Sequence, residues 1–141
     1  MSAAAMTAQP AARLSRGVIA GRVLSGIAIL FLAMDAGGKL IAPAAMIANS
    51  PPLGLPAEIG FYRLLGLILA ACTLLYTWPR TAVLGAVLLT GYLGGAIACH
   101  LRVGNPLVSH TLFGLYLGAI VWGGLLLRRP ALRAVFMGDA R

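Results

Sequence analysis

The histidines of this chain lie at one short predicted turn. The stretch GGAIACHLRVGNPLVSHT contains both of them, His100 and His110, with Arg102 between the two. Imidazole gives and takes protons and ligates metals, and guanidinium donates to carbonyl or anionic oxygens. The residue types at this turn therefore suit ligand binding, proton relay or a metal site.

The composition sets the environment of that turn. Of the 141 residues, 60% are hydrophobic and 10% are charged, and the mean hydropathy is +0.94. Soluble domains carry about 25% charged residues, so we predict an integral membrane protein with the lipid bilayer as its partner. The formal net charge is +8. Because the basic residues flank apolar segments, this charge indicates membrane orientation, not nucleic-acid binding.

Apolar segments interrupted by prolines predict the fold. A transmembrane helix needs about 20 mostly apolar residues, and the chain contains four such segments. We expect an all-α bundle of four transmembrane helices near residues 21–42, 57–78, 81–101 and 107–127. This transmembrane domain, 17–129, lies between a disordered N-terminal tail, 1–16, and a short basic C-terminal tail, 130–141.

The basic residues also predict orientation. Eight of them fall on one side of the predicted bundle: Arg13, Arg16, Arg22, Arg80, Arg128, Arg129, Arg133 and Arg141. The other side has three, Lys39, Arg63 and Arg102. By the positive-inside rule, both termini are predicted to be cytoplasmic and the histidine turn to lie at the outer face.

Small residues predict close packing of the third and fourth helices. Gly91 and Gly95 are spaced four residues apart in the third predicted helix, as are Gly114 and Gly118 in the fourth. Such pairs let membrane helices approach closely.

Ionisable and hydroxyl side chains collect in the predicted outer half. Charge inside a membrane costs about 2.5–3.5 kcal/mol per residue near a helix centre, so buried charges require a structural or functional reason. The candidate ligand-binding residues are Asp35, Lys39, Glu58, Tyr62, Arg63, His100, Arg102 and His110. Asp35 and Lys39, one turn apart, can pair. The alternative is structural: Asp35 and Arg63 form an interhelical ion pair, and the residues of the turn lie beside lipid headgroups.

These side chains do not define a reaction. The histidines and carboxylates come from four elements without ligand-type spacing, so neither a metal nor a haem is expected. No nucleophile elbow or glycine-rich phosphate loop is present in the sequence. We therefore assign no catalytic residue, and whether the protein is an enzyme stays open.

Several segments of the chain resemble a known family. DAGGKL, LGLP, FYRLLGLILAACTLLY and the block PRTAVLGAVLLTGYLGGAIACHLRVGNPLVSHTLFGLYLGAIVWGGLLLR resemble the DoxX-like family of small bacterial four-helix membrane proteins, over about residues 22–133. The resemblance implies a multi-pass inner-membrane protein that is an accessory component of a redox or stress-related system, with a redox subunit or a second copy as partner. If the chain is enzymatic, the resemblance implies a subunit of a quinone-linked oxidoreductase. The polar positions typical of this branch are Lys39, Arg63, His100, Arg102 and His110.

Two functions remain open, and a third is less favoured. The first is the accessory component. The second is a binder of a quinone, or of another small lipophilic or anionic molecule, with Tyr62, Arg63 or His110 as hydrogen-bond donors. A small transporter is less favoured because polar residues are sparse in the predicted inner half.

Overall fold

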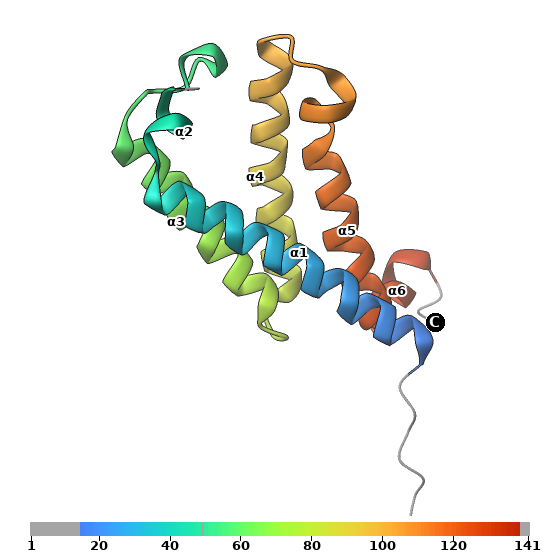
Figure 1. The fold of residues 1–141 in the computed structure, drawn as a ribbon. Coiled ribbons are helices and arrows are strands. Elements are labelled where there is room, and N and C mark those ends of the chain that lie inside the picture. The colour runs from blue at the N-terminus through green and yellow to red at the C-terminus, as the bar shows by residue number, and fades with distance from the viewer. Residues whose placement is uncertain (1–14, 49, 139–141) are drawn as a thin grey trace, which may run out of the picture.

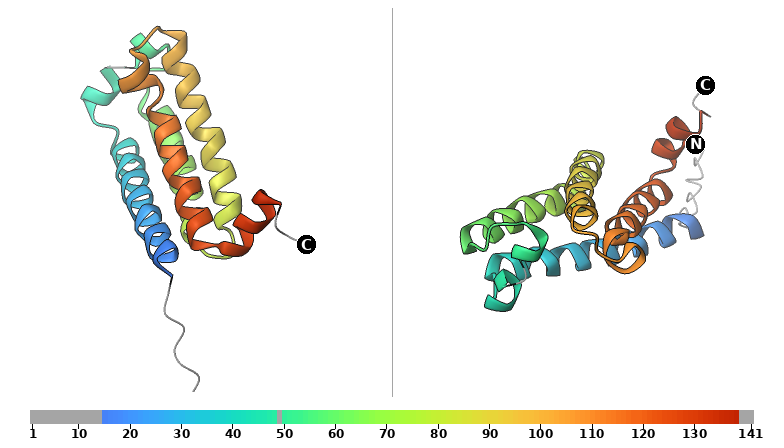
Figure 2. Two further views of the ribbon diagram at one scale, coloured as in Figure 1. Left: turned by 90° about the vertical axis from the view of Figure 1, so that its right-hand side faces the viewer. Right: turned by 90° about the horizontal axis from the view of Figure 1, so that it is seen from above.

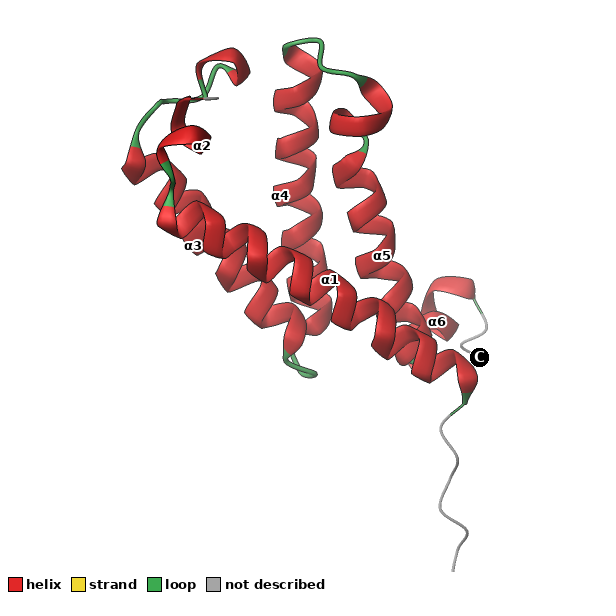
Figure 3. Ribbon diagram, viewed as in Figure 1, coloured by secondary structure: helices red, strands yellow, loops and turns green. Residues whose placement is uncertain are grey.

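The described part of the chain is built from helices joined by short loops (Figure 3). The computed structural model describes residues 15–48 and 50–138. Its elements are α1 (Arg16–Ile41), α2 (Ala44–Ala48), η1 (Pro51–Leu53), α3 (Ile59–Thr77), α4 (Ala82–Arg102), η2 (Leu107–Thr111), α5 (Phe113–Arg128) and α6 (Pro130–Met137). No strand occurs in these two ranges, which confirms the all-α prediction.

Four segments are long and apolar enough to cross a bilayer. They are Arg16–Ile41, Ile59–Thr77, Ala82–Arg102 and Leu107–Arg128, the last of which joins η2 to α5. Large apolar side chains remain exposed on them, including Leu30, Met34 and Leu74. A bilayer solvates such surface, so the chain is a multi-pass membrane protein.

The helix ends differ from the sequence-based expectation in two places. α1 begins at Arg16 rather than near residue 21, because the Ser15 hydroxyl caps it by accepting from the Val18 amide at 3.3 Å. The fourth span opens with a π-helical turn, η2, before regular α-helix starts at Phe113. Within the predicted short basic C-terminal tail, Pro130–Met137 forms the helix α6. The rest of the predicted tails, 1–14 and 139–141, lies outside the described residues.

The four spanning helices form a closed ring (Figures 1 and 2). α1 packs against α3 and α5, and α4 packs against the same two helices. A glycine lies at each of the four contacts, where an added Cβ would come within 3.0 Å of the neighbouring helix. They are Gly21 (α1 to α5), Gly66 (α3 to α1), Gly85 (α4 to α3) and Gly114 (α5 to α4).

The predicted glycine contact between α4 and α5 is correct only in part. A Cβ at Gly114 would lie 3.0 Å from the Leu93 carbonyl oxygen, and one at Gly118 would lie 3.9 Å from a Leu93 methyl group. A Cβ at Gly91 or Gly95 would meet no atom within 4 Å. These two glycines on α4 do not pack against α5. The four-residue spacing alone cannot say which helix face turns to the neighbour.

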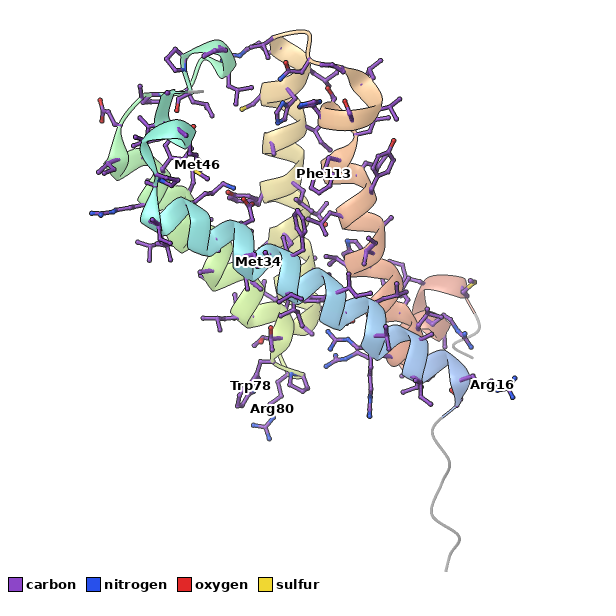
Figure 4. The ribbon with its side chains drawn as sticks, in the orientation of Figure 1. Arg16, Met34, Met46, Trp78, Arg80 and Phe113 are labelled. Carbon is purple, nitrogen blue, oxygen red and sulfur yellow. The ribbon has the colours of Figure 1, made fainter. Side chains whose placement is uncertain are left out.

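The two ends of the bundle differ in character. At one end, here called the arginine end, lie the start of α1, the turn from α3 to α4, and α6; Arg16 and Arg80 mark it in Figure 4. At the opposite end, here called the pocket end, lie the α1–α3 connection and the α4–α5 turn. That the arginine end faces the cytoplasm stays a prediction from the positive-inside rule.

A buried hydrogen-bond network joins three helices toward the arginine end. The Tyr76 hydroxyl donates to the Val121 carbonyl oxygen at 2.8 Å and accepts from the Ser25 hydroxyl at 3.0 Å. The Arg128 guanidinium lies 4.9 Å from the centre of the Tyr76 ring and donates to the Tyr76 carbonyl oxygen at 3.2 Å. This network fixes α1, α3 and α5 relative to one another near the arginine end.

Candidate functional site

A pocket of about 810 Å³ opens between the four spans at the pocket end. Its walls are contributed by α1, α2, α3, α4, η2 and α5. Met46 of α2 and Phe113 of α5, on opposite sides of this space in Figure 4, both line it. Volumes of this size hold drug-sized ligands.

Two glycines spaced four residues apart on α4 leave space for the pocket, because they have no side chains. Gly91 and Gly95, whose missing side chains meet no neighbour, both line it. Phe31 of α1 and Phe113 of α5 line it too, with ring centroids 5.2 Å apart. Both residues are 43% exposed and lie within spanning segments. The aromatic pair therefore lies at a part of the pocket wall that the protein does not fully cover.

An ion pair from α1 contributes charge to the pocket wall. The Lys39 ammonium donates to the Asp35 carboxylate one helical turn away, and both residues line the pocket. This is the pairing expected from their spacing. Within 15–48 and 50–138 it is the one ion pair formed, and Arg63 is not part of it. The hypothesis of an Asp35–Arg63 pair is therefore wrong.

The α4–α5 turn brings the histidines together. The rings of His100 and His110 lie 6.2 Å apart between centroids, and both residues line the pocket. His100 Nδ1 is 2.8 Å from the Asn105 amide nitrogen, and His110 Nδ1 is 2.7 Å from the Ser109 hydroxyl. With Nδ1 occupied, Nε2 is the ring nitrogen that each histidine has available for a ligand.

The π-helical turn explains how His110 reaches this position. η2 contains bonds from the Thr111 amide to the Pro106 carbonyl oxygen at 3.2 Å and from Leu112 to Leu107 at 2.8 Å. Such wide turns alter the direction of side chains and recur at functional sites. Sequence patterns do not distinguish a π-turn from the first turn of an α-helix, so it was not predicted.

Three polar residues lining the pocket are absent from the predicted site. They are Tyr92, Cys99 and Thr111. Among the described residues no group hydrogen-bonds to the Tyr92 hydroxyl. A signal for Tyr92 exists in the sequence, since it precedes His100 by eight residues and therefore lies near the same face of α4.

Tyr62 lines the pocket but its hydroxyl is already bound. It forms a hydrogen bond of 2.5 Å with the hydroxyl of the fully buried Ser50. Ser50 belongs to the α1–α3 connection, residues 43–48 and 50–58, which we call the cap. The cap contributes Met46 and Leu53 to the pocket lining. Tyr62 thus holds the cap over the pocket and has less capacity left for a ligand.

The remaining predicted site residues do not line the pocket. Glu58 is exposed at the start of α3 and its side chain caps nothing. Arg63 Nε donates to the Leu40 carbonyl oxygen at 3.3 Å, at the end of α1. Arg102 donates to the Leu53 carbonyl oxygen at 2.7 Å. Both arginines bind free backbone carbonyls instead, a structural role that spacing could not reveal.

Arg102 ties the cap to α4. Gly54 has φ +64°, and a Cβ there would lie 1.9 Å from an Arg102 guanidinium nitrogen, so glycine both forms the turn and leaves room for the side chain. We expect Arg102→Ala to speed hydrogen exchange of the Leu53, Gly54 and Leu55 amides, which bond within this turn, about tenfold. The reason is that a hydrogen bond to a charged group contributes roughly 1.5 kcal/mol. Arg63→Ala is the control. Unchanged exchange of these three amides in Arg102→Ala would show that this bond does not hold the cap.

The described residues contain no cluster of metal ligands and no disulfide. Within the described ranges no group of three or more His, Cys, Asp or Glu side chains could hold a metal ion. Cys72 and Cys99 are both free thiols, and Cys99 lines the pocket. The pocket lining contains hydrogen-bonding side chains and one ion pair.

Comparison with known proteins gives the family. The model of the DoxX-like family matches residues 23–124, which is most of the chain and all of the pocket wall. The chain belongs to the DoxX-like family. No curated protein and no solved structure matches this DoxX-like chain.

Proposed function

We propose that this protein binds a small amphipathic molecule from the membrane in the pocket between its four spans. The observation that carries the proposal is that the pocket is large enough for a ligand and that its wall includes polar groups without a partner among the described residues. The pocket holds about 810 Å³, and its largely apolar wall includes the Tyr92 hydroxyl, which no described residue satisfies. A hydroxyl with no protein partner at an apolar pocket wall can bond the polar head of a ligand, and a polar head needs such a partner there.

A quinone is the leading candidate for the ligand. Its ring is apolar, its two carbonyl oxygens accept hydrogen bonds, and its chain is lipophilic. Tyr92, His100 and His110 supply donors in the pocket. Phe31 and Phe113 line the pocket and are partly exposed within spanning segments, so a long chain can extend past them into the bilayer.

The proposal includes the wider role implied by the family resemblance. A bundle that holds a lipophilic ligand can act as an accessory component of a redox or stress-related membrane system, beside a redox subunit or a second copy. The corresponding location is a bacterial inner membrane, with both termini cytoplasmic. The run of arginines at the arginine end supports that orientation.

Two neighbouring glycines allow a matched test. Gly95 lines the pocket, whereas Gly94 lines a separate shallow groove between α4 and α5; a Cβ at either meets no atom within 4 Å. We expect Gly95→Phe to fill the pocket and Gly94→Phe to leave it open, with both variants folding. Small molecules extracted from gently purified protein are then identified by mass spectrometry.

The expected result is a lipophilic molecule present in near-stoichiometric amount in wild type and Gly94→Phe, and largely lost in Gly95→Phe. Arg63→Ala should retain it, because Arg63 does not line the pocket. Equal amounts in wild type and Gly95→Phe, or an empty wild-type protein, would contradict the proposal.

A further inference from the structure

The charge balance of the pocket is set by two residues. Of the charged side chains at the pocket end, Asp35 and Lys39 line the pocket, whereas Glu58, Arg63 and Arg102 do not. The two arginines donate to backbone carbonyl oxygens instead. Lys39 and Asp35 are paired with each other. The pocket therefore contains one cation and one anion in direct contact, without net charge.

The other polar groups of the wall act through hydrogen bonds. The Asn105 amide nitrogen donates to His100 Nδ1, so Nε2 is the ring nitrogen left for a ligand. Tyr92 adds a hydroxyl to which no described residue bonds. These groups match an oxygen acceptor of a neutral head. Lys39 is the one lysine or arginine among the described residues of the pocket lining and is already paired with Asp35, so a carboxylate or phosphate would lack the compensating charge that it needs in an apolar site.

We propose that the pocket selects uncharged lipophilic molecules whose head bears a carbonyl or hydroxyl oxygen, and that Asp35 sets this selectivity by neutralising Lys39. This inference rests on the proposed function. Without the carboxylate, the Lys39 ammonium would be an unpaired cation facing the pocket and would attract an anionic head. Asp35 thus disfavours anionic ligands, because it already pairs with the Lys39 ammonium that an anion would need. The selectivity comes from making the binding of anions unfavourable.

The test uses three probes with one alkyl chain: hexadecanol, hexadecanoate and hexadecylamine. The three probes are made to compete in pairs for purified full-length protein in nonionic detergent. The pH is one at which hexadecanoate is ionised and hexadecylamine is protonated. Wild type should prefer hexadecanol. Asp35→Asn should bind hexadecanoate at least about tenfold more tightly than wild type does, because a single charge pair has about that effect even where water screens it and a larger one at lower dielectric. Hexadecanol binding should change little.

Three further variants keep the result interpretable. Lys39→Gln leaves the Asp35 carboxylate alone, so the preference should move to hexadecylamine, and this outcome tests the idea even if Asp35→Asn does not fold. Asp35→Asn combined with Lys39→Gln restores neutrality and should return the preference to hexadecanol. Glu58→Gln, a carboxylate that does not line the pocket, should behave as wild type.

The failures are distinguishable. If wild type binds hexadecanol in a manner blocked by Gly95→Phe, yet neither charge variant alters the preference among heads, the role of Asp35 is wrong and the binding pocket stands. Tighter binding of hexadecanoate than hexadecanol by wild type would also overturn the inference alone. If no probe competes for a site that Gly95→Phe blocks, the proposed function and the inference fall together.

Discussion

Gly85→Ala is expected to destabilise the bundle strongly. A Cβ at Gly85 would lie 2.2 Å from the backbone nitrogen of Tyr76 and 2.5 Å from its Cα. These are backbone atoms of α3, so no side chain can rotate away, and α3 and α4 would have to separate. Forcing extra atoms into a packed contact costs about 1–3 kcal/mol and sometimes more. Unfolding by SDS in mixed micelles measures the loss.

Gly95→Ala is the matched control for this substitution. Gly95 lies on the same helix, and its Cβ would meet no atom within 4 Å. Because alanine favours helix over glycine by up to about 1 kcal/mol, the variant should be as stable as wild type or slightly more stable. Similar unfolding midpoints for Gly85→Ala and Gly95→Ala would mean that the α3–α4 contact is looser than described.

Tyr76→Ala is the second substitution with a large expected effect. Tyr76 is fully buried and is the largest side chain in that class. Its loss would leave a cavity, remove the bonds to Ser25 and Val121 and take away the ring over which Arg128 lies. Truncating a buried aromatic ring to alanine costs about 3–5 kcal/mol. The free energy of unfolding in mixed micelles should fall by that order.

Tyr76→Phe separates the hydroxyl from the ring. It keeps the packing and the ring beside Arg128 but removes both hydroxyl hydrogen bonds. Hydrogen bonds between membrane helices contribute roughly 0.6–1.7 kcal/mol each, so this variant should lose much less than Tyr76→Ala. Equal losses would assign the stability to the polar network; no loss in either would show that the network does not hold the helices.

The sequence predicted the spans because membrane crossing leaves a strong one-dimensional signal. Twenty apolar residues bounded by proline or arginine are visible without knowledge of any contact. A helix N-cap residue is a weaker signal in the sequence. The start of α1 at Arg16, after the N-cap Ser15, was therefore missed. The family could also be inferred, since the block from residue 79 to 128 carries most of its pattern.

For the candidate site, the sequence predicts only how deep each residue lies in the membrane. Asp35, Lys39, Tyr62, His100 and His110 do come to one pocket. The depth of a residue in the membrane does not tell which way its side chain points around the helix axis, and that direction decides whether the residue lines the pocket or faces lipid. Arg63 and Arg102 were misassigned for this reason. Their partners, Leu40 and Leu53, are backbone carbonyls, which carry no trace in the residue types.

The exposed Phe31–Phe113 pair has a consequence for how the pocket fills. Since the two residues line the pocket and are partly exposed within spanning segments, a ligand that enters past them is already dissolved in the bilayer. Occupancy then follows the mole fraction of the ligand among the lipids, and its aqueous solubility does not enter. A sparingly soluble molecule that partitions into the membrane can saturate the protein while its concentration in water stays negligible.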